Sequence, residues 1–252
     1  MTDIQLKETL IRLGDDSLVL AQRLAEWCGH APILEEDIAL TNIALDLLGR
    51  AQNYLKLAGD LCDPVKSDDD LAYHRDAEEF RNLLLLEQPN GHFGDTICRQ
   101  FLFDHFSLLR AEHLASQTVN KDVAAIAAKA IKEIRYHVDH SSKWMKRLGD
   151  GTTESHEKIQ GSLDNLWKYT DEMFAADDFD RAAIEAGLMP NLGDLKKVWA
   201  KRVGEVISEA TLTIPSNSNM GIGGRRGEHT PHLAEMLEEM QVLPRTYPGT
   251  SW

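Results

Sequence analysis

The sequence has few residues that interrupt helices or form disulfides. Only 8 of its 252 residues are proline, and these fall between long segments of helical period. No alternation of apolar and polar residues is long enough to predict a β-strand. The three cysteines, Cys28, Cys62 and Cys98, are widely spaced and form no CxxC pair. They are therefore predicted to be free thiols in a reducing cytoplasm rather than a disulfide framework.

Basic charge and long apolar runs are also scarce. The chain has 41 acidic and 27 basic residues, a formal net charge of -14. This balance argues against a nucleic-acid-binding face and against adhesion to anionic lipid. No apolar run approaches the roughly 20 residues that cross a bilayer, and the N-terminus lacks the basic-then-apolar order of a signal peptide. We expect a cytoplasmic protein that binds neither nucleic acid nor membrane.

The hydrophobic residues, 42% of the chain, recur at helical spacing and predict an all-α protein. A third helical region is expected to begin near Asp76, break at residues 88–91 and resume at Phe93. Linkers are short, so residues 1–252 are predicted to form one domain, with a core at about 8–148 and accessory helices at about 154–241. The other predicted helices are Glu8–Cys28, Leu34–Ala58, Lys121–Leu148, Glu154–Phe174, Leu192–Thr211 and Pro231–Gln241, and the resumed helix ends at Gln117.

The second predicted helix is apolar around almost its whole circumference. One four-helix core covers only part of a helix, because a surface helix normally keeps a polar face for water. The remainder is predicted to be an exposed patch that binds a partner. The residues concerned are Ile38, Leu40, Ile43, Ala44, Leu45, Leu47 and Leu48.

Two pairs of acidic residues have the spacing of antiparallel helix pairs. Asp16 and Asp46 lie 30 residues apart around a turn at residues 29–32, and Asp104 and Glu133 lie 29 apart around Asn120. A di-iron carboxylate bundle takes a carboxylate from each of two helices and Glu-x-x-His from each of the other two. The near-equal spacings predict two related hairpins in one four-helix bundle.

The helical faces support this arrangement unevenly. Asp104 and Glu133 lie within apolar stripes and are predicted to point inward, where an acid needs a partner or a ligand. Asp16 lies at the edge of its stripe, and Asp15 is expected to face away. Asp46 cannot be placed by periodicity because its helix is apolar nearly all round.

The histidines of a di-iron site are missing. Gly49 stands three residues after Asp46, and Tyr136 stands three residues after Glu133. Glycine offers no ligand, and a neutral tyrosine, whose pKa is normally near 10, is a poor one. Glu133 and His137 have an i, i+4 spacing that can serve a metal or form a buried ion pair, and the ion pair is favoured. The other candidate ligand is His140; His156, His229 and His232 are expected at the surface.

The site is therefore interpreted as a degenerate di-iron site. Its acids, Asp46, Asp104 and Glu133, are predicted to serve stability. Their candidate partners are His137, Tyr136, Arg135 and Arg50. The adjacent Arg225 and Arg226 are predicted either to bind a CoA phosphate or an acidic patch of a partner, or to be a solvated surface pair, which is slightly favoured.

Several long segments resemble one known family, in order from Arg12 to about Met240. They are RLGDDSLVLAQRLAEWCGHAP, IALDLLGRAQNY, NLLLLEQPNGHFGDTI, AKAIKEIRYH, WMKRLGDGT and GGRRGEHTPHL. The chain resembles the small structural subunits, known as C subunits, of bacterial ring-1,2-phenylacetyl-CoA epoxidases. The resemblance implies a ferritin-like fold with a four-helix core and additional C-terminal helices.

The resemblance also implies partners and a division of labour. A homologous catalytic subunit would hold the di-iron centre, and a reductase with FAD and an iron–sulfur cluster would supply electrons from NADPH. The complex would insert one oxygen atom of O2 into the ring of phenylacetyl-CoA. This chain would carry no cofactor and no catalytic residue.

Two other functions stay open. The first is a metal-bearing oxygenase subunit that uses Asp16, Asp46, Asp104, Glu133 and His137, and the second is a ferritin-like carrier. A homodimer is the alternative assembly when the chain is alone.

Overall fold

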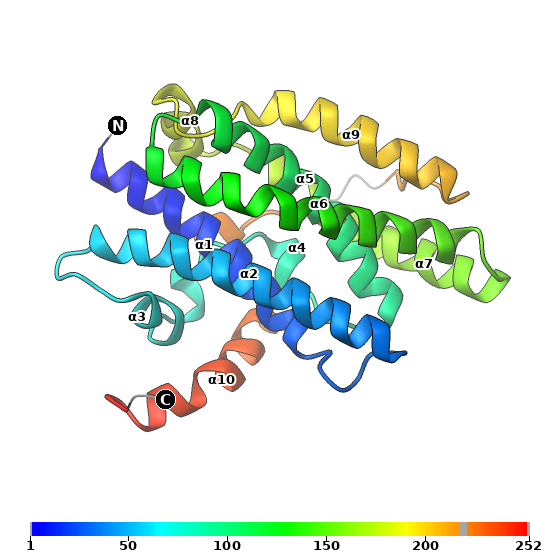
Figure 1. Ribbon diagram of the computed structural model, residues 1–252, viewed down its shortest axis with the longest axis horizontal. Helices are drawn as coiled ribbons and strands as arrows, with labels where there is room; N and C mark the ends of the chain where they lie inside the picture. The colour runs from blue at the N-terminus through cyan, green and yellow to red at the C-terminus, as the bar shows by residue number, and fades with distance from the viewer. Residues whose placement is uncertain (1, 217–220, 251–252) are drawn as a thin grey trace. The chain divides into compact units, whose positions relative to one another are not determined.

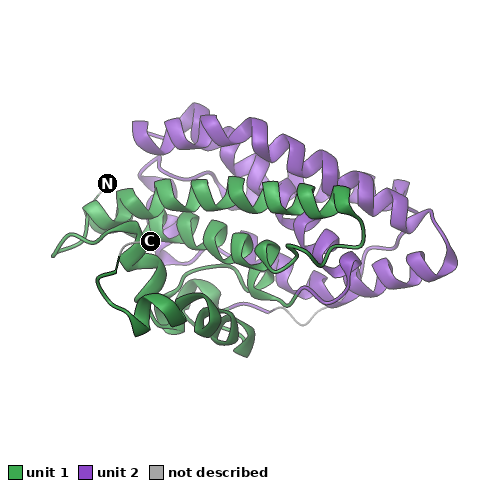
Figure 2. Cartoon of the chain, turned by 60° about the horizontal axis from the view of Figure 1, so that its bottom comes forward, with its two compact units in different colours: residues 1–89, 223–252 green, residues 90–222 purple. Residues whose placement is uncertain are grey.

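The computed structural model describes residues 2–216 and 221–250, and within them every regular element is helical (Figure 1). This confirms the all-α prediction and is consistent with a ferritin-like helical fold. The chain divides into two compact units, one within residues 1–89 and 223–252 and the other within residues 90–222 (Figure 2). That the two predicted hairpins share one four-helix core stays a prediction. In the described part of the chain, no helix is long and apolar enough to cross a bilayer.

The first unit is built on the hairpin of α1 (Asp3–Ala25) and α2 (Leu34–Asp60), which lie side by side. A capping box begins α1: the Thr2 hydroxyl accepts from the Gln5 amide, and the Gln5 side chain accepts from the Thr2 amide. The turn contains Gly29 at a φ of +79°, which favours glycine. The shorter elements are α3 (Asp68–Tyr73), η1 (Ala77–Glu79), α4 (Leu84–Glu87), η3 (Gly224–Arg226) and α10 (Pro231–Thr246).

The helical region predicted from Asp76 to residue 88 is largely wrong, since only the short η1 and α4 form there. Its amides bond elsewhere: the Arg81 amide donates to Asp15 at 2.8 Å, and the Leu83 amide donates to Asp16 at 3.1 Å. Amides that would have joined a helical ladder thus donate to α1 carboxylates, which holds the segment extended.

The C-terminal part of this unit is bonded to the end of α3 and to the residues that follow it. Gln241 of α10 donates to the backbone oxygens of Ala72 and Arg75, both at 3.0 Å. The η3 turn packs closely as well, because a Cβ on Gly224 would lie 2.1 Å from the Asn82 oxygen. Only glycine permits this approach of two backbones.

The second unit is built on α5 (Phe93–Gln117) and α6 (Lys121–Gly149), joined by a short connection. The Asn120 side chain accepts from the amides of Asp122 and Val123, which confirms the predicted N-cap. The predicted helix over 154–174 forms as α7 (Thr153–Leu166) followed by the 3-10 segment η2 (Trp167–Phe174). The short α8 (Asp178–Glu185) was not predicted; α9 (Leu192–Glu209) was.

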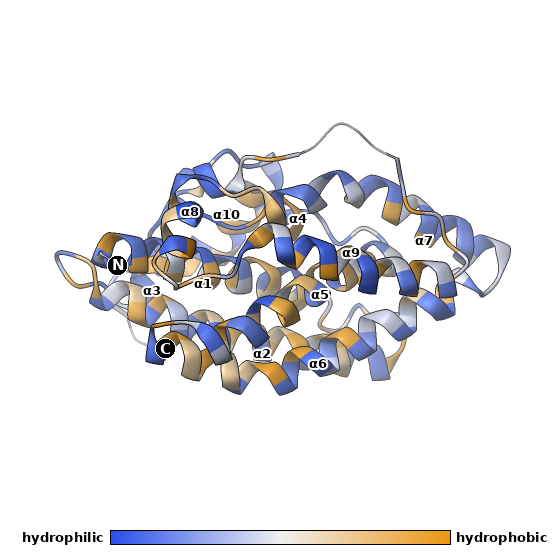
Figure 3. Ribbon diagram, turned by 90° about the horizontal axis from the view of Figure 1, so that it is seen from above, coloured by the Kyte–Doolittle hydropathy of each residue, from blue (hydrophilic) through white to orange (hydrophobic). Residues whose placement is uncertain are grey.

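Polar and apolar residues alternate along α6 with the period of an amphipathic helix (Figure 3). Its apolar face packs Ala130 and Ile134 against Leu108 and Ala111 of α5. Trp199 of α9 is buried, and its indole N–H donates to the Leu102 oxygen at 3.0 Å. The second unit is thus a helix pair with further helices packed on α5.

Candidate functional site

Two adjacent aspartates of α1, Asp15 and Asp16, are fully buried in the first unit. The guanidinium of Arg75 donates to both oxygens of Asp15, through Nη1 at 2.9 Å and through Nη2. The expectation that Asp15 faces away is therefore wrong. It is buried because Arg75 and the Arg81 amide replace the hydrogen bonds that water would have provided.

Asp16, the first predicted carboxylate position, is held by Arg225. Both Nη atoms donate to it, one to each oxygen, at 2.9 Å. A bidentate guanidinium of this kind binds both oxygens of one carboxylate and neutralises its charge. The Asp16 side chain is fully buried, and only 13% of the Arg225 side chain is exposed. Asp16 is thus one half of a buried ion pair.

This geometry corrects the solvated-surface interpretation for Arg225, whose two terminal nitrogens are engaged with Asp16. Arg226 differs: its side chain is 52% exposed and pairs with Glu228 at 2.9 Å. Contact of either arginine with a CoA phosphate stays a prediction.

A further buried carboxylate of this unit, Glu87, was missed. It accepts from the Asn82 amide group at 2.9 Å, the Thr230 amide at 2.6 Å and His229 Nδ1 at 2.7 Å. The other nitrogen of His229 lies 3.1 Å from the Phe80 oxygen. Both ring nitrogens of His229 thus lie within hydrogen-bond distance of oxygen atoms of this segment. The expectation of a surface His229 is wrong; an acid inside the apolar run LLLLEQ was the available signal.

In the second unit, Asp104 of α5 is buried as predicted. Its carboxylate accepts from the Ser141 hydroxyl of α6 at 3.0 Å and lies 3.5 Å from the Gln100 amide nitrogen. Neither partner was predicted from the sequence. A hydroxyl and an amide group thus supply hydrogen bonds to a carboxylate at a predicted ligand position.

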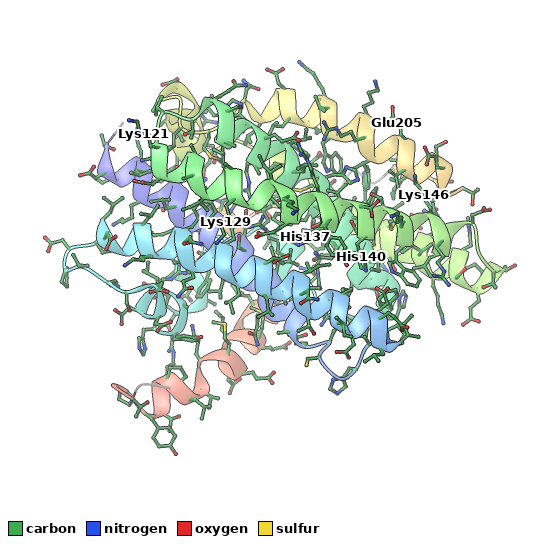
Figure 4. The ribbon with its side chains drawn as sticks, in the orientation of Figure 1. Lys121, Lys129, His137, His140, Lys146 and Glu205 are labelled. Atoms are coloured by element: carbon green, nitrogen blue, oxygen red, sulfur yellow. The ribbon has the colours of Figure 1, made fainter. Side chains whose placement is uncertain are left out.

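The predicted site positions of α6 include His137, which Figure 4 labels together with His140. His137 is buried and Glu133 is half-buried, while 48% of Tyr136 is exposed. The Tyr136 ring lies against the rings of His137 and His140, with centroids 6.3 and 6.1 Å away. Arg135 donates to Glu112 at 3.2 Å. The Glu133–His137 ion pair stays a prediction.

The α2 positions also lack a histidine. Asp46 is half-buried. A Cβ on Gly49 would meet no heavy atom within 4 Å, and the Gly49 oxygen accepts from the Asn53 amide group at 2.6 Å. Arg50, a predicted partner of the buried acids, donates to Ser17 at 3.2 Å.

These donors do not fit a di-iron centre. Such a centre needs carboxylates whose oxygens are available to the metal and a histidine on each of two helices. Here a guanidinium binds both oxygens of Asp16, Gly49 has no side chain, and Tyr136 is half-exposed. In residues 2–216 and 221–250, no three side chains of His, Cys, Asp or Glu form a group that could hold a metal ion. The absence of iron from the purified chain stays a prediction.

His105 is a further titratable group of α5, 5% exposed and 3.1 Å from the Ser142 hydroxyl. Burial, with a smaller contribution from Arg202, lowers the pKa of His105 to about 4. Burial also raises the pKa of Cys98 above its ordinary value. Both groups are therefore neutral near pH 7, and the cysteines are free thiols as predicted.

The fold and the site together define an all-α protein with helix pairs whose buried carboxylates are held by arginine, hydroxyl and amide groups. The chain belongs to the phenylacetic acid catabolic protein family, whose model matches residues 1–252. It is 48% identical over 248 residues to the C subunit of the 1,2-phenylacetyl-CoA epoxidase of Escherichia coli (strain K12), and the match covers 98% of this chain and 99% of that protein. The resemblance stated from the sequence is thereby confirmed.

Proposed function

We propose that this chain is the non-catalytic structural subunit of a phenylacetyl-CoA 1,2-epoxidase that acts in aerobic phenylacetate catabolism. It scaffolds a homologous subunit that carries the di-iron centre, in a cytoplasmic heteromer served by a reductase with FAD and an iron–sulfur cluster. The similarity to one subunit of a known epoxidase supports the complex. The Asp16–Arg225 ion pair is the observation that supports the non-catalytic role.

The ion pair and a metal compete for the same oxygens. Arginine stays charged at every relevant pH, so its guanidinium cannot yield the site by losing a proton. Removing one partner of a buried pair costs about 3–5 kcal/mol, and metal binding at Asp16 would have to supply that free energy as well. One oxygen of Asp104 is similarly occupied, because it accepts a hydrogen bond from the Ser141 hydroxyl.

The metal-bearing subunit and the carrier are the competing functions. Both need ligands that converge, and the candidate that remains on one helix is Glu133 with His137. Tyr136 contributes an exposed ring beside them rather than a second histidine. A structural role therefore explains the residues at more of the predicted ligand positions than a metal-bearing subunit or a carrier does.

Elemental analysis and reconstituted turnover test the proposal. We expect the isolated chain to carry no stoichiometric iron, and the complex with its catalytic subunit to carry iron and epoxidise phenylacetyl-CoA. Asp104→Asn, which keeps the shape of the side chain, should leave turnover unchanged once the complex has assembled. Two irons per isolated chain would contradict the proposal.

The variant Glu133→Ala provides a second test of the proposed function. We expect this variant to lower the melting temperature of the chain and to leave the turnover of assembled complex intact. Intact stability with abolished turnover would assign Glu133 a catalytic role. Lys132→Ala, an exposed neighbour on α6, is the matched control for both measurements.

A further inference from the structure

A second apolar face runs along α2. It is exposed, whereas the first apolar face is buried in the core. Leu40, Ile43 and Leu47 are buried. By contrast, Leu34 is 72% exposed and Leu45 is 59% exposed. The full set, here called the outer row, consists of Leu34 (72%), Ile38 (54%), Leu45 (59%) and Leu48 (46%).

The spacing of the outer row is that of a helix–helix seam. With Thr41 between Ile38 and Leu45, successive positions are four, three, four and three residues apart. This 3.5-residue repeat places side chains against one facing helix along its length. From Leu34 to Leu48 the row extends about 21 Å, or four helical turns.

The outer row leads directly into a pocket of the first unit. Leu48 lines a cavity of about 170 Å³, and Leu55, one turn past Gln52 on the same face of α2, lines it too. Ala51 of α2, Leu18 of α1 and Ala72 of α3 complete its apolar lining. The pocket is large enough for a side chain such as Leu, Met or Phe, because a cavity of about 150 Å³ holds a benzene-sized group.

The lining of this pocket is also acidic. Asp68 and Asp69 line it together with Tyr73, and among the described residues no lysine or arginine does. Burial, Asp69 and Asp68 all raise the pKa of Tyr73, so the phenol stays neutral and leaves the two carboxylates as the charges of the lining. A cation beside an inserted apolar side chain would meet these carboxylates.

We propose that the outer row and this pocket together bind one α-helix of the partner subunit, which inserts an apolar side chain into the pocket and places a Lys or Arg within one turn of it. The identity of the partner rests on the proposed function. The geometry of the surface rests on the exposed row, its repeat and the acidic pocket at its end.

A second copy of this chain fits the surface less well, because its charges oppose it. In an antiparallel contact of α2 with α2, the exposed Glu35 of one copy approaches Asp68 and Asp69 of the other. In a parallel contact, each acidic group approaches its own equivalent. Like charges brought together in a contact disfavour it, so both two-fold arrangements are penalised.

The test measures the affinity of the full chain for its catalytic subunit by calorimetry, with circular dichroism as a check on folding. Leu45→Asp should weaken binding about tenfold or more, since it replaces a central apolar residue of the seam with a charged one. Leu243→Asp is the matched control, because Leu243 of α10 is 53% exposed in the same unit but lies outside the row. If Leu45→Asp is poorly folded, Leu45→Gln is used in its place.

A separate double substitution tests the contribution of the pocket. Asp68→Asn with Asp69→Asn should weaken binding and reduce its salt dependence, whereas Asp60→Asn with Asp63→Asn, both exposed and outside the pocket, should do neither. If neither Leu45→Asp nor Asp68→Asn with Asp69→Asn weakens binding, this inference is overturned, and the proposed structural role is unaffected. A wild-type chain that forms no complex would overturn the proposed function and this inference with it.

Discussion

The buried pair of Asp16 and Arg225 gives the sharpest prediction for stability. Arg225→Met removes the guanidinium but retains much of the length and apolar volume of the side chain. A fully buried carboxylate then loses two hydrogen bonds of 2.9 Å and its counter-charge. Breaking such a pair costs about 3–5 kcal/mol, a large share of the roughly 5–15 kcal/mol that stabilises a typical domain.

The assay is urea unfolding of the full chain followed by circular dichroism, with free energies compared at one pH. A double-mutant cycle with Asp16→Asn separates the pair from the rest: the double variant should be more stable than the sum of the single losses predicts, because neither charge is left buried alone. Arg226→Met is the matched control, since its pair with Glu228 is exposed to solvent and should contribute little to stability. A loss below about 1 kcal/mol for Arg225→Met, or additive single losses, would refute the reasoning.

Three further predictions follow from single positions. The folded-state pKa of His105, about 4, lies below the unfolded value of about 6.5, so the unfolded chain binds the extra proton between these values and stability falls as pH drops from 6.5 to 4. His105→Gln should remove about 3 kcal/mol of that pH dependence, measured as the difference between the two stability profiles; parallel profiles would contradict it. Gly49→Ala should stabilise by up to about 1 kcal/mol because it adds a helix-favouring residue in open space, whereas Gly224→Ala should destabilise by more than that, and melting temperatures compare them. The exposed Cys28 should react with a thiol reagent in the native chain and the buried Cys98 only after unfolding, as mass spectrometry would show; equal rates would be inconsistent with the structure.

The long helices could be predicted from the sequence because their cores are periodic. The helices over Leu34–Asp60, Phe93–Gln117, Lys121–Gly149 and Leu192–Glu209 lie within a few residues of their predicted bounds. Asp104 was also correctly predicted to be buried, because it interrupts an apolar stripe. In each case the information is local, within a few turns of one helix.

The errors lie where distant segments determine the local structure. Asp15 was predicted to face away because periodicity cannot show Arg75, which lies 60 residues later. The same holds for His229, whose partner Glu87 is 142 residues away. The residues near Arg81 have helical composition, yet they are extended because α1 carboxylates take their amides. No pattern within a helix encodes such partners.

The first unit combines two segments that are far apart in the chain, and this affects the order in which the units can fold during synthesis. Asp16 emerges from the ribosome early, and Arg225 follows 209 residues later. At a translation rate of about 5–20 residues per second, Arg225 is synthesised about 10–40 s after Asp16. All of the residues between 90 and 222 are made in that interval, so the second unit can fold first. The first unit is completed only when the last segment of the chain arrives, and any chain that stops at residue 222 leaves Asp16 without Arg225.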